Sequence, residues 1–365
     1  MSKIAKFVGL DVHKDTISIA VCEGGALAEP ADLGQIAHDV PRLFKRLLCL
    51  GEPGDLHVAY EAGPTGFALA RALRERGIDC VVVAPSKTPV LPGDRVKTDK
   101  RDAIKLARYL RMGQLVAIDL PGSEQEALRD LVRARQDAVR ARHRARQQLK
   151  GFLLRHGKSF EGKSSWTHRH HDWIRGQRFE SEAQRAVLED YWNEVVHAGE
   201  RVAHLTSLVE SCAQAPAFTK LYHALQALRG ISTVIAATLV AELGSFLRFA
   251  TPAKLMSYVG VTPSEHSSGQ RTRRGSITKA GNSSVRHVLI EASWCQRLRP
   301  AMSDRMKKRN EGLPLEIQEI AWKAQKRLHQ RFVRMTARGK STQCTVVAIA
   351  RELAGFVWAI GRQVA

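Results

Sequence analysis

The sequence has few features of a secreted or membrane protein. Its six cysteines are scattered, with no CxxC pair and no secretory signal ahead of them. No run of about 18 or more apolar residues is present, and neither end carries a lipidation signal. We therefore expect a reduced, cytoplasmic protein that has no structural zinc site and no membrane partner.

Acidic residues are also in short supply. Asp and Glu number 36 against 57 Lys and Arg, which gives a formal net charge of +21 at pH 7 and an isoelectric point near 10.1. An excess of this size predicts a polyanionic partner, and nucleic acid is the simplest one. At 365 residues the chain has room for two or three domains.

Residues 1–118 have the pattern of an α/β domain. The runs "FVGLDV" and "TISIAV" predict a β-hairpin, and His13, Lys14 and Asp15 between them are expected to be turn residues. The segment "LHVAYEAGPTGFALARALRERGIDCVVVAPS" then predicts a strand, a Gly-Pro turn, an amphipathic helix and another strand. Strands that alternate with a helix indicate an α/β sheet.

Residues 119–218 have the pattern of a helical rod. Apolar residues recur at spacings of three and four from Leu128 to Leu149, and again from Leu188 to Val209. The two stretches predict a coiled-coil hairpin. Basic residues occupy its other faces, where they could contact phosphates or a partner, or simply be solvated; those we expect to bind nucleic acid are Arg133, Arg140, Arg144 and Arg146.

One short motif in the rod, "WTHRHHDW", is rich in histidine and tryptophan. His168, His170 and His171 lie between Trp166 and Trp173, with no cysteine or carboxylate cluster beside them. A metal site is therefore less favoured than an aromatic and cationic patch that contacts RNA.

Residues 219–365 predict a mainly helical domain. In "LQALRGISTVIAATLVAELGSF" a helix, a turn at Gly230 and a second helix from about Ser232 resemble a helix-hairpin-helix, whose turn amides can hold a phosphate. A plain helical hairpin fits the same residues. Two amphipathic helices, "LEIQEIAWKAQKRLHQRFVRM" and "TVVAIARELAGFVWAI", are expected to close the core of this domain.

Four carboxylates are placed where a metal site could form. Asp11 lies in the first strand run, Glu61 at the end of another strand, and Asp99 and Asp102 three residues apart at a helix start. Such a set could hold two divalent ions for phosphoryl transfer. Each acid also has a structural interpretation, as a helix-dipole, capping or hairpin residue, but an acid inside an apolar strand costs stability unless it is exposed or bound.

The stretch "HSSGQRTRRGSITKAGN", residues 266–282, contains serines and glycines interspersed with arginines and has almost no aliphatic side chain. Two interpretations remain open on residue types alone. One serine could be a nucleophile aimed at a phosphodiester, or the stretch could be a basic loop on a nucleic-acid backbone.

Taken in order, these motifs resemble the transposases of the insertion sequence 110 family, RNA-guided DNA recombinases that use a bridge RNA. The matching segments are "VGLDVHKDTISIAV", "YEAGPTG", "KTDKRDAIKLA", the rod, "LRGISTVIAATLVAELG" and "YVGVTPSEHSSGQRTRRGSITKAGNSSVRHVL". One departure is "GIS" after the Gly230 turn, where the family more usually has a second glycine.

The resemblance implies a RuvC-like domain of ribonuclease H fold, with Asp11, Glu61, Asp99 and Asp102 as an Asp-Glu-Asp-Asp set that binds Mg²⁺, or Mn²⁺ in its place. It implies a transposase domain whose catalytic serine precedes a glycine, which is Ser268 here. Ser267 is a second candidate because it duplicates the serine. The cations expected to offset phosphate charge are Arg271, Arg273, Arg274 and Lys279.

The partners implied by the resemblance are donor DNA, target DNA and the bridge RNA, with homodimers pairing into tetramers at the bacterial nucleoid in the cytoplasm. Two other functions fit parts of the pattern. A Mg²⁺-dependent, hydrolytic junction-resolving nuclease would need the carboxylates but leaves the serine stretch unexplained. A non-enzymatic nucleic-acid-binding protein would need only the hairpin and the rod.

The charge excess predicts strongly salt-dependent binding. A protein that makes about six to ten phosphate contacts loses roughly 10³ to 10⁵ in affinity between 50 and 200 mM salt. Filter binding of labelled nucleic acid across that range is expected to show such a loss. A flat salt dependence would contradict an electrostatic contact.

Overall fold

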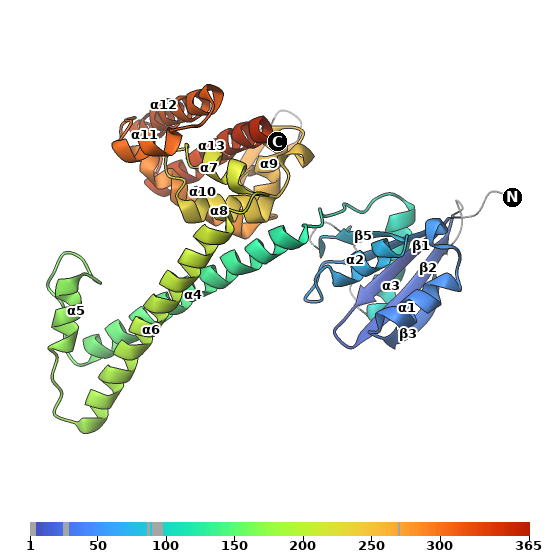
Figure 1. Ribbon diagram of the computed structural model, residues 1–365, viewed down its shortest axis with the longest axis horizontal. Helices are drawn as coiled ribbons and strands as arrows, with labels where there is room; N and C mark the ends of the chain where they lie inside the picture. Colours follow the sequence, from blue (N-terminus) through green and yellow to red (C-terminus); the bar gives the residue numbers. More distant parts are fainter. Residues whose placement is uncertain (1–4, 25–28, 86–87, 90–97, 269–270) are drawn as a thin grey trace. The chain divides into compact units, whose positions relative to one another are not determined.

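The computed structural model describes residues 5–24, 29–85, 88–89, 98–268 and 271–365 (Figure 1). The chain divides into two compact units, Met1–Leu120 and Pro121–Ala365, and each is described by itself. The division into three domains at residues 118 and 218 stays a prediction.

The first unit contains a mixed sheet of five strands in the order β3-β2-β1-β4-β5. Strands β1 and β2 form the predicted antiparallel hairpin, whereas β4 lies parallel to both β1 and β5. The strands are β1 (Lys6–Val12), β2 (Thr16–Glu23), β3 (Ala31–Ala37), β4 (Leu56–Glu61) and β5 (Asp79–Val83). The prediction of an α/β sheet is confirmed.

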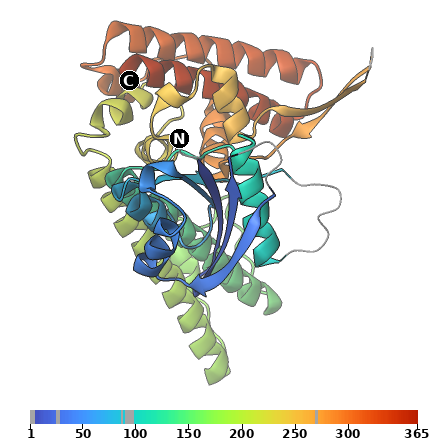
Figure 2. The same ribbon diagram turned by 90° about the vertical axis from the view of Figure 1, so that its right-hand side faces the viewer.

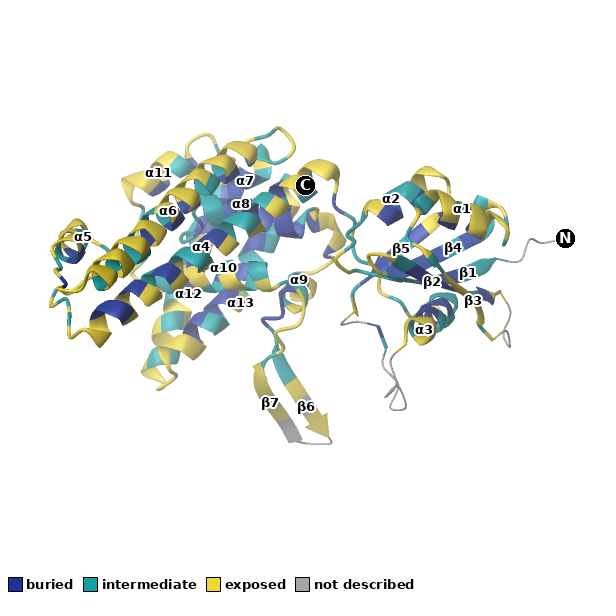
Figure 3. Ribbon diagram, turned by 90° about the horizontal axis from the view of Figure 1, so that it is seen from below, coloured by how far each residue is buried: buried dark blue, intermediate teal, exposed yellow. Residues whose placement is uncertain are grey.

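Helices cover both faces of this sheet. Figure 3 shows α1 (Val40–Leu48) and α2 (Ala68–Glu75) on one face and α3 (Asp99–Arg111) on the other. Successive strand residues point to opposite faces, so Val8 and Leu10 of β1 are buried with α1 and α2, and Phe7 packs with α3. A short 3-10 turn, η1 (Pro53–Asp55), precedes β4.

Gly9 lets α3 lie directly against β1. A Cβ atom at this position would lie 2.1 Å from the carbonyl oxygen of Ala103 and 2.5 Å from the amide nitrogen of Ala107. Both are backbone atoms of α3, and a helix cannot move one of them alone. Glycine is therefore required here, and the contact fixes where α3 sits relative to the end of β1.

The predicted rod consists of two long helices, α4 (Ser123–Arg155) and α6 (Glu182–Cys212), which lie side by side (Figure 1). A shorter helix, α5 (His168–Arg175), lies in the connection at the far end. The near end of the rod shares the core of the helical body through Leu128 and Val209. The prediction of a helical hairpin is confirmed.

The rest of the second unit is mainly helical, as predicted. Its helices are α7 (Thr219–Leu225), α8 (Thr233–Leu243), α9 (Pro252–Val259), α10 (Ser283–Ser293), α11 (Asp304–Asn310), α12 (Leu315–Ala337) and α13 (Thr342–Val364), with 3-10 turns η3 (Phe246–Arg248) and η4 (Trp294–Arg297). Figure 2 shows the two amphipathic helices α12 and α13 side by side.

Helix α13 is long and apolar enough to cross a membrane by length and composition alone. Half of its apolar stretch is buried inside the protein, and Ile349, Leu353 and Val357 belong to the core of the helical body. The packing explains the apolar composition, because a central core helix must be apolar on the sides that its neighbours cover.

The serine-rich stretch is not the irregular loop that its composition suggests. Strands β6 (Pro263–Ser268) and β7 (Arg271–Ile277) pair antiparallel as a β-hairpin that stands away from the helices (Figure 3). The backbone ladder between the strands stabilises this hairpin without a buried apolar face. Since apolar alternation is the main signal of a strand in a sequence, a polar ribbon of this kind is missed.

The contact at Gly9 generates a stability prediction. Gly9→Ala is expected to lower the free energy of unfolding of the first unit by about 1–3 kcal/mol, the usual cost of overpacking. Urea unfolding of the full chain would measure it. Gly54→Ala is the control, since a Cβ there meets nothing within 4 Å. Equal changes in the two variants would contradict the argument.

Candidate active site

Asp11 and Glu61 lie on the α3 face of the sheet at the ends of two neighbouring strands. In β1, Asp11 follows Gly9 by two residues and therefore points to the same face. Leu10 is paired with Tyr60 of the parallel strand β4, and both belong to the opposite face. The next residue on each strand, Asp11 and Glu61, accordingly faces α3.

The first turn of α3 supplies the other two predicted carboxylates. Thr98 caps the helix, because its Oγ1 accepts a hydrogen bond from the amide of Arg101 at 3.3 Å. Asp99 and Asp102 then occupy the first turn, where negative charge also favours the helix dipole. The structural and the functional interpretations of these two acids are therefore compatible.

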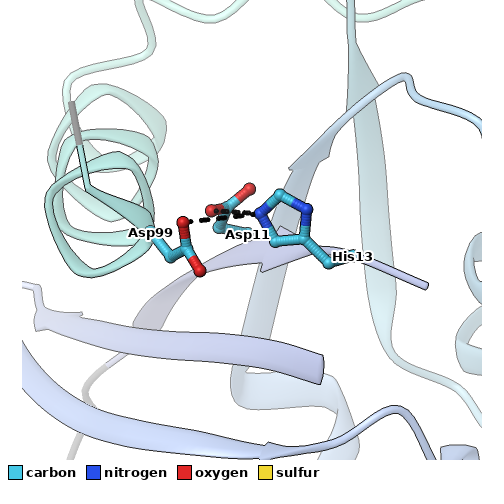
Figure 4. A group of neighbouring side chains, drawn as sticks. All are labelled: Asp11, His13 and Asp99. Atoms are coloured by element: carbon cyan, nitrogen blue, oxygen red, sulfur yellow. Dashed lines mark hydrogen bonds and ion pairs between the residues drawn. The ribbon is translucent and has the colours of Figure 1, made fainter. Parts of the chain in front are cut away.

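Asp11, His13 and Asp99 form a compact group of side chains (Figure 4). His13 Nε2 is 3.2 Å from Asp11 Oδ2 and 3.6 Å from Asp99 Oδ1. One ligand atom from each of the three residues lies within 4.8 Å of the others, and it is the one such group found in the described ranges. The spacing is suitable for a shared metal ion.

His13 lies in the turn between β1 and β2, as predicted, but its side chain makes a contact that the sequence pattern did not indicate. The residue directly follows β1, and its ring reaches the two carboxylates. The His38 ring fixes the backbone there, since its Nδ1–H donates to the His13 carbonyl at 2.6 Å. The signal available in the sequence was a histidine two residues after an acid at a strand end.

Glu61 and Asp102 are not part of that compact group. Glu61 Oε1 accepts a hydrogen bond from Thr88 Oγ1 at 2.7 Å, which orients its carboxylate. Asp102 acts on Asp11 through its charge. The fold thus brings two of the four predicted acids into ligand distance and places the other two on the same face of the sheet.

Burial raises the pKa of Asp11, and His13 lowers it through its charge and its hydrogen bond, while the charges of Asp99 and Asp102 add to the rise. Negative charge is therefore crowded at the end of β1. Carboxylate oxygens are hard ligands of the kind that Mg²⁺ and Mn²⁺ prefer. A divalent cation would relieve the crowding, so the donor set fits such an ion.

In the second unit, Arg133 has an internal partner. Its guanidinium donates to both carboxylate oxygens of Glu242, at 2.8 and 3.1 Å, and Glu242 is 1% exposed. Asn282 donates to the same carboxylate at 2.8 Å and caps α10 by accepting from the amide of Val285. Glu242 was missed in the sequence, because a single acid in an apolar helix carries no pattern.

The other three arginines predicted to bind nucleic acid from the rod differ in the contacts that their side chains already make. Arg140 pairs with Asp137 at 2.9 Å on the exposed side of α4. The guanidinium of Arg146 lies 4.6 Å from the ring centre of Trp166. Arg144 is exposed. Arg144 is therefore the rod arginine best placed to reach a phosphate.

The two serines of the hairpin have different surroundings. Ser267 Oγ donates to Glu265 Oε1 at 2.8 Å. Ser268, the last residue of β6, is exposed, and within the described part of the chain its hydroxyl has no hydrogen-bond partner. Arg273 and Lys279 are exposed nearby in sequence; Arg271 and Arg274 lie on β7, and their side chains fall outside the described residues.

The helix pair predicted around Gly230 is present as α7 and α8. The groups at the start of α8 are already in use. Ser232 Oγ accepts from the amide of Ile235, and Thr233 Oγ1 donates to the carboxylate of Glu210. A carboxylate thus lies beside the first residue of α8, and its negative charge disfavours phosphate binding at this turn.

The acidic group and the fold around it match known domains. Residues 8–157 match the family model of a transposase domain with the Asp-Glu-Asp-Asp set, and residues 222–307 match the model described as transposase of the IS116/IS110/IS902 family. The protein is therefore a transposase, a DNA strand-cleaving enzyme whose first unit is a ribonuclease H-like domain. A domain of this type needs a divalent metal.

Relatives cover almost the whole chain. It is 43% identical over 360 residues to a candidate transposase, y4qE, of Sinorhizobium fredii, covering 98% of this chain and 88% of that protein. It is 31% identical over 334 residues to the transposase for insertion sequence element IS1533 of Leptospira borgpetersenii, covering 89% and 95%. The chain belongs to the IS110 family of transposases, which confirms the resemblance noted in its sequence.

Asp11→Asn is expected to stabilise the metal-free protein at pH 7. Because the folded pKa of Asp11 lies above its unfolded value, its contribution to stability is full below the unfolded value of about 3.9 and is lost as pH rises through the folded pKa. The neutral amide removes that cost. Thermal unfolding in a chelator would measure the gain, and an Asp11→Asn variant that melts below wild type at pH 7 would contradict it.

Proposed function

We propose that this transposase cleaves and rejoins DNA through a transient covalent link to Ser268. The observation that carries the proposal is the contrast between the two serines: the Ser267 hydroxyl is held by Glu265, whereas that of Ser268 is exposed and has no partner among the described residues. An unengaged hydroxyl at the end of a projecting hairpin can approach a phosphodiester without first breaking an internal hydrogen bond.

In the proposed step, the Ser268 oxygen attacks the phosphorus of one phosphodiester. A serine–phosphorus ester forms, the bond to one DNA oxygen breaks, and the serine proton is transferred so that the leaving oxygen becomes a hydroxyl. One ester replaces another, so a second DNA hydroxyl can reverse the step and rejoin strands. Exposed Arg273 and Lys279 offset the phosphate charge during the exchange.

The four carboxylates would bind a metal ion that acts on the same phosphodiester. Asp11 and Asp99 would hold the metal with Glu61 and Asp102, and Mg²⁺ is the ion proposed, with Mn²⁺ as its substitute. When bound, the ion would supply Lewis-acid stabilisation of phosphoryl charge. His13 would orient the carboxylates of Asp11 and Asp99 through the contacts described above.

The substrates proposed are a donor and a target DNA, brought together by a structured bridge RNA that pairs with both. The net charge of +21 supports several nucleic-acid partners at once. Joining two DNA molecules needs several strand exchanges, which supports homodimers that pair into tetramers. The proposed place of action is the nucleoid in the bacterial cytoplasm.

Ser268→Ala is expected to abolish the covalent protein–DNA adduct, because the attacking oxygen is removed. Ser267→Ala, the matched control, is expected to retain it. Denaturing gels of protein incubated with end-labelled DNA and Mg²⁺ would show the adduct, and mass spectrometry would locate it. An adduct mapped to Ser267, or strand cleavage by Ser268→Ala at the wild-type rate, would contradict the proposal and favour a hydrolytic nuclease.

A further inference from the structure

The far end of the rod is built from aromatic and cationic side chains that the proposed chemistry does not use. We call this region the rod tip; its aromatic residues are Phe152, Phe160, Trp166, Trp173, Phe179, Tyr191 and Trp192. Cations stack on three of these rings: Arg146 on Trp166, Arg175 on Trp192 and Lys158 on Phe179.

A cavity of about 310 Å³ lies in the rod tip between α4, α5 and the connection that joins them. Phe160, His170 and Trp173 form its aromatic side, and Gln147, Lys150 and Lys158 its polar side. None of the described residues that line the cavity is acidic. Its volume is in the range of small-molecule sites, which begin near 300 Å³.

The aromatic side of the cavity is held in place by close contacts. The rings of His170 and Trp173 are stacked, with centres 5.7 Å apart and planes 11° apart, and Phe160 meets His170 edge-on at 4.7 Å. The Phe160 ring also lies over Gly162, where a Cβ atom would come within 2.2 Å of it. The glycine therefore makes the position of this ring possible.

Backbone strain accompanies this packing. Trp166 has a φ of 67°, in the left-handed region that a bulky side chain seldom adopts. Its amide donates to His170 Nδ1 at 3.0 Å, and His170 is 2% exposed. Burial lowers the pKa of His170, which favours the neutral ring that can accept this bond. Strain of this kind persists only where the surrounding contacts enforce it.

From this arrangement we propose that the rod tip binds one unpaired nucleotide of a nucleic-acid strand. The base would lie against Phe160 and Trp173, and the flanking phosphates would meet Lys150 and Lys158. Flat aromatic rings suit any base, because every base has a π face, and lysines suit the charge of the backbone. A base inside a duplex cannot enter such a cavity, so the site selects for single strands or bulges.

The proposal rests on the part of the proposed function that gives the chain nucleic-acid partners, and it does not depend on Ser268. The chemistry is shared by RNA and DNA. The experiment therefore uses the full chain with three fluorescein-labelled probes: a single-stranded oligouridine RNA, an oligothymidine DNA of the same length, and a blunt DNA duplex. Binding is measured by fluorescence anisotropy over a range of salt.

The first pair of variants removes charge. Lys150→Gln with Lys158→Gln is expected to weaken single-strand binding and to reduce the slope of log affinity against log salt by roughly 1.4, at about 0.7 for each phosphate that is no longer neutralised. The control is Arg201→Gln with Lys323→Gln, which removes equal charge from two exposed positions outside the cavity. Equal reductions of single-strand affinity in the two double variants would overturn the proposal.

The second pair of variants tests stacking. Trp173→Leu is expected to weaken single-strand binding by about 5- to 140-fold, the range for removal of one base–aromatic stack, and Trp173→Phe is expected to keep most of it. Circular dichroism would monitor folding. If Trp173→Leu unfolds, the affinities of the lysine variants and of Trp173→Phe test the proposed nucleotide site instead. Equal affinity in the leucine and wild-type proteins would also overturn the proposal.

The three probes separate the sources of the nucleotide. Lysine-dependent binding of RNA alone, DNA alone or both single strands supports the proposal and identifies the strand. A dependence seen only with the duplex overturns it. Ser268→Ala provides the distinction from the proposed chemistry: it is expected to bind all three probes like wild type, so absence of the covalent adduct and absence of rod-tip binding are independent results.

Discussion

The geometry of the first unit depends on the close packing of α3 on β1. This packing is possible because Gly9 has no side chain. At Gly9 the backbone of α3 lies where a Cβ atom would otherwise be. Asp11 is two residues further along the same strand and face, and Asp99 begins the helix that the glycine admits. The acidic group therefore depends on a contact that contains no acidic residue, and any shift of α3 would change the distances between its carboxylates.

Much of this could be predicted from the sequence. Two short runs rich in Val and Ile predicted β1 and β2, spacings of three and four predicted the rod, and acids at a strand end and a helix start marked the candidate site. The contact between His13 and Asp99, the buried ion pair of Glu242 and the β6–β7 hairpin were missed for a common reason. Each depends on a partner distant in sequence or on backbone pairing, and neither leaves a periodic pattern of apolar residues.

The buried carboxylate of Glu242 links three parts of the second unit. It accepts from Arg133 on α4 and from Asn282, which caps α10, and it is itself part of α8. Removing one partner of a buried ion pair leaves an uncompensated charge, which costs about 3–5 kcal/mol. The side chain of Glu242 thus joins the base of the rod to Asn282, which lies after the serine hairpin. The arginine-rich sequence of α4 alone suggests only a surface that binds phosphates.

The pleat of β6 limits which insertions and deletions this strand can accept. Successive residues of a strand face opposite sides, so Ser267, tied to Glu265, and the open Ser268 present their hydroxyls in opposite directions. Inserting or deleting one residue in the regularly paired part of the strand, between Glu265 and Ser268, would exchange those directions, whereas a change of two residues would preserve them. Among natural relatives, length variation in this strand is therefore expected to occur in even steps.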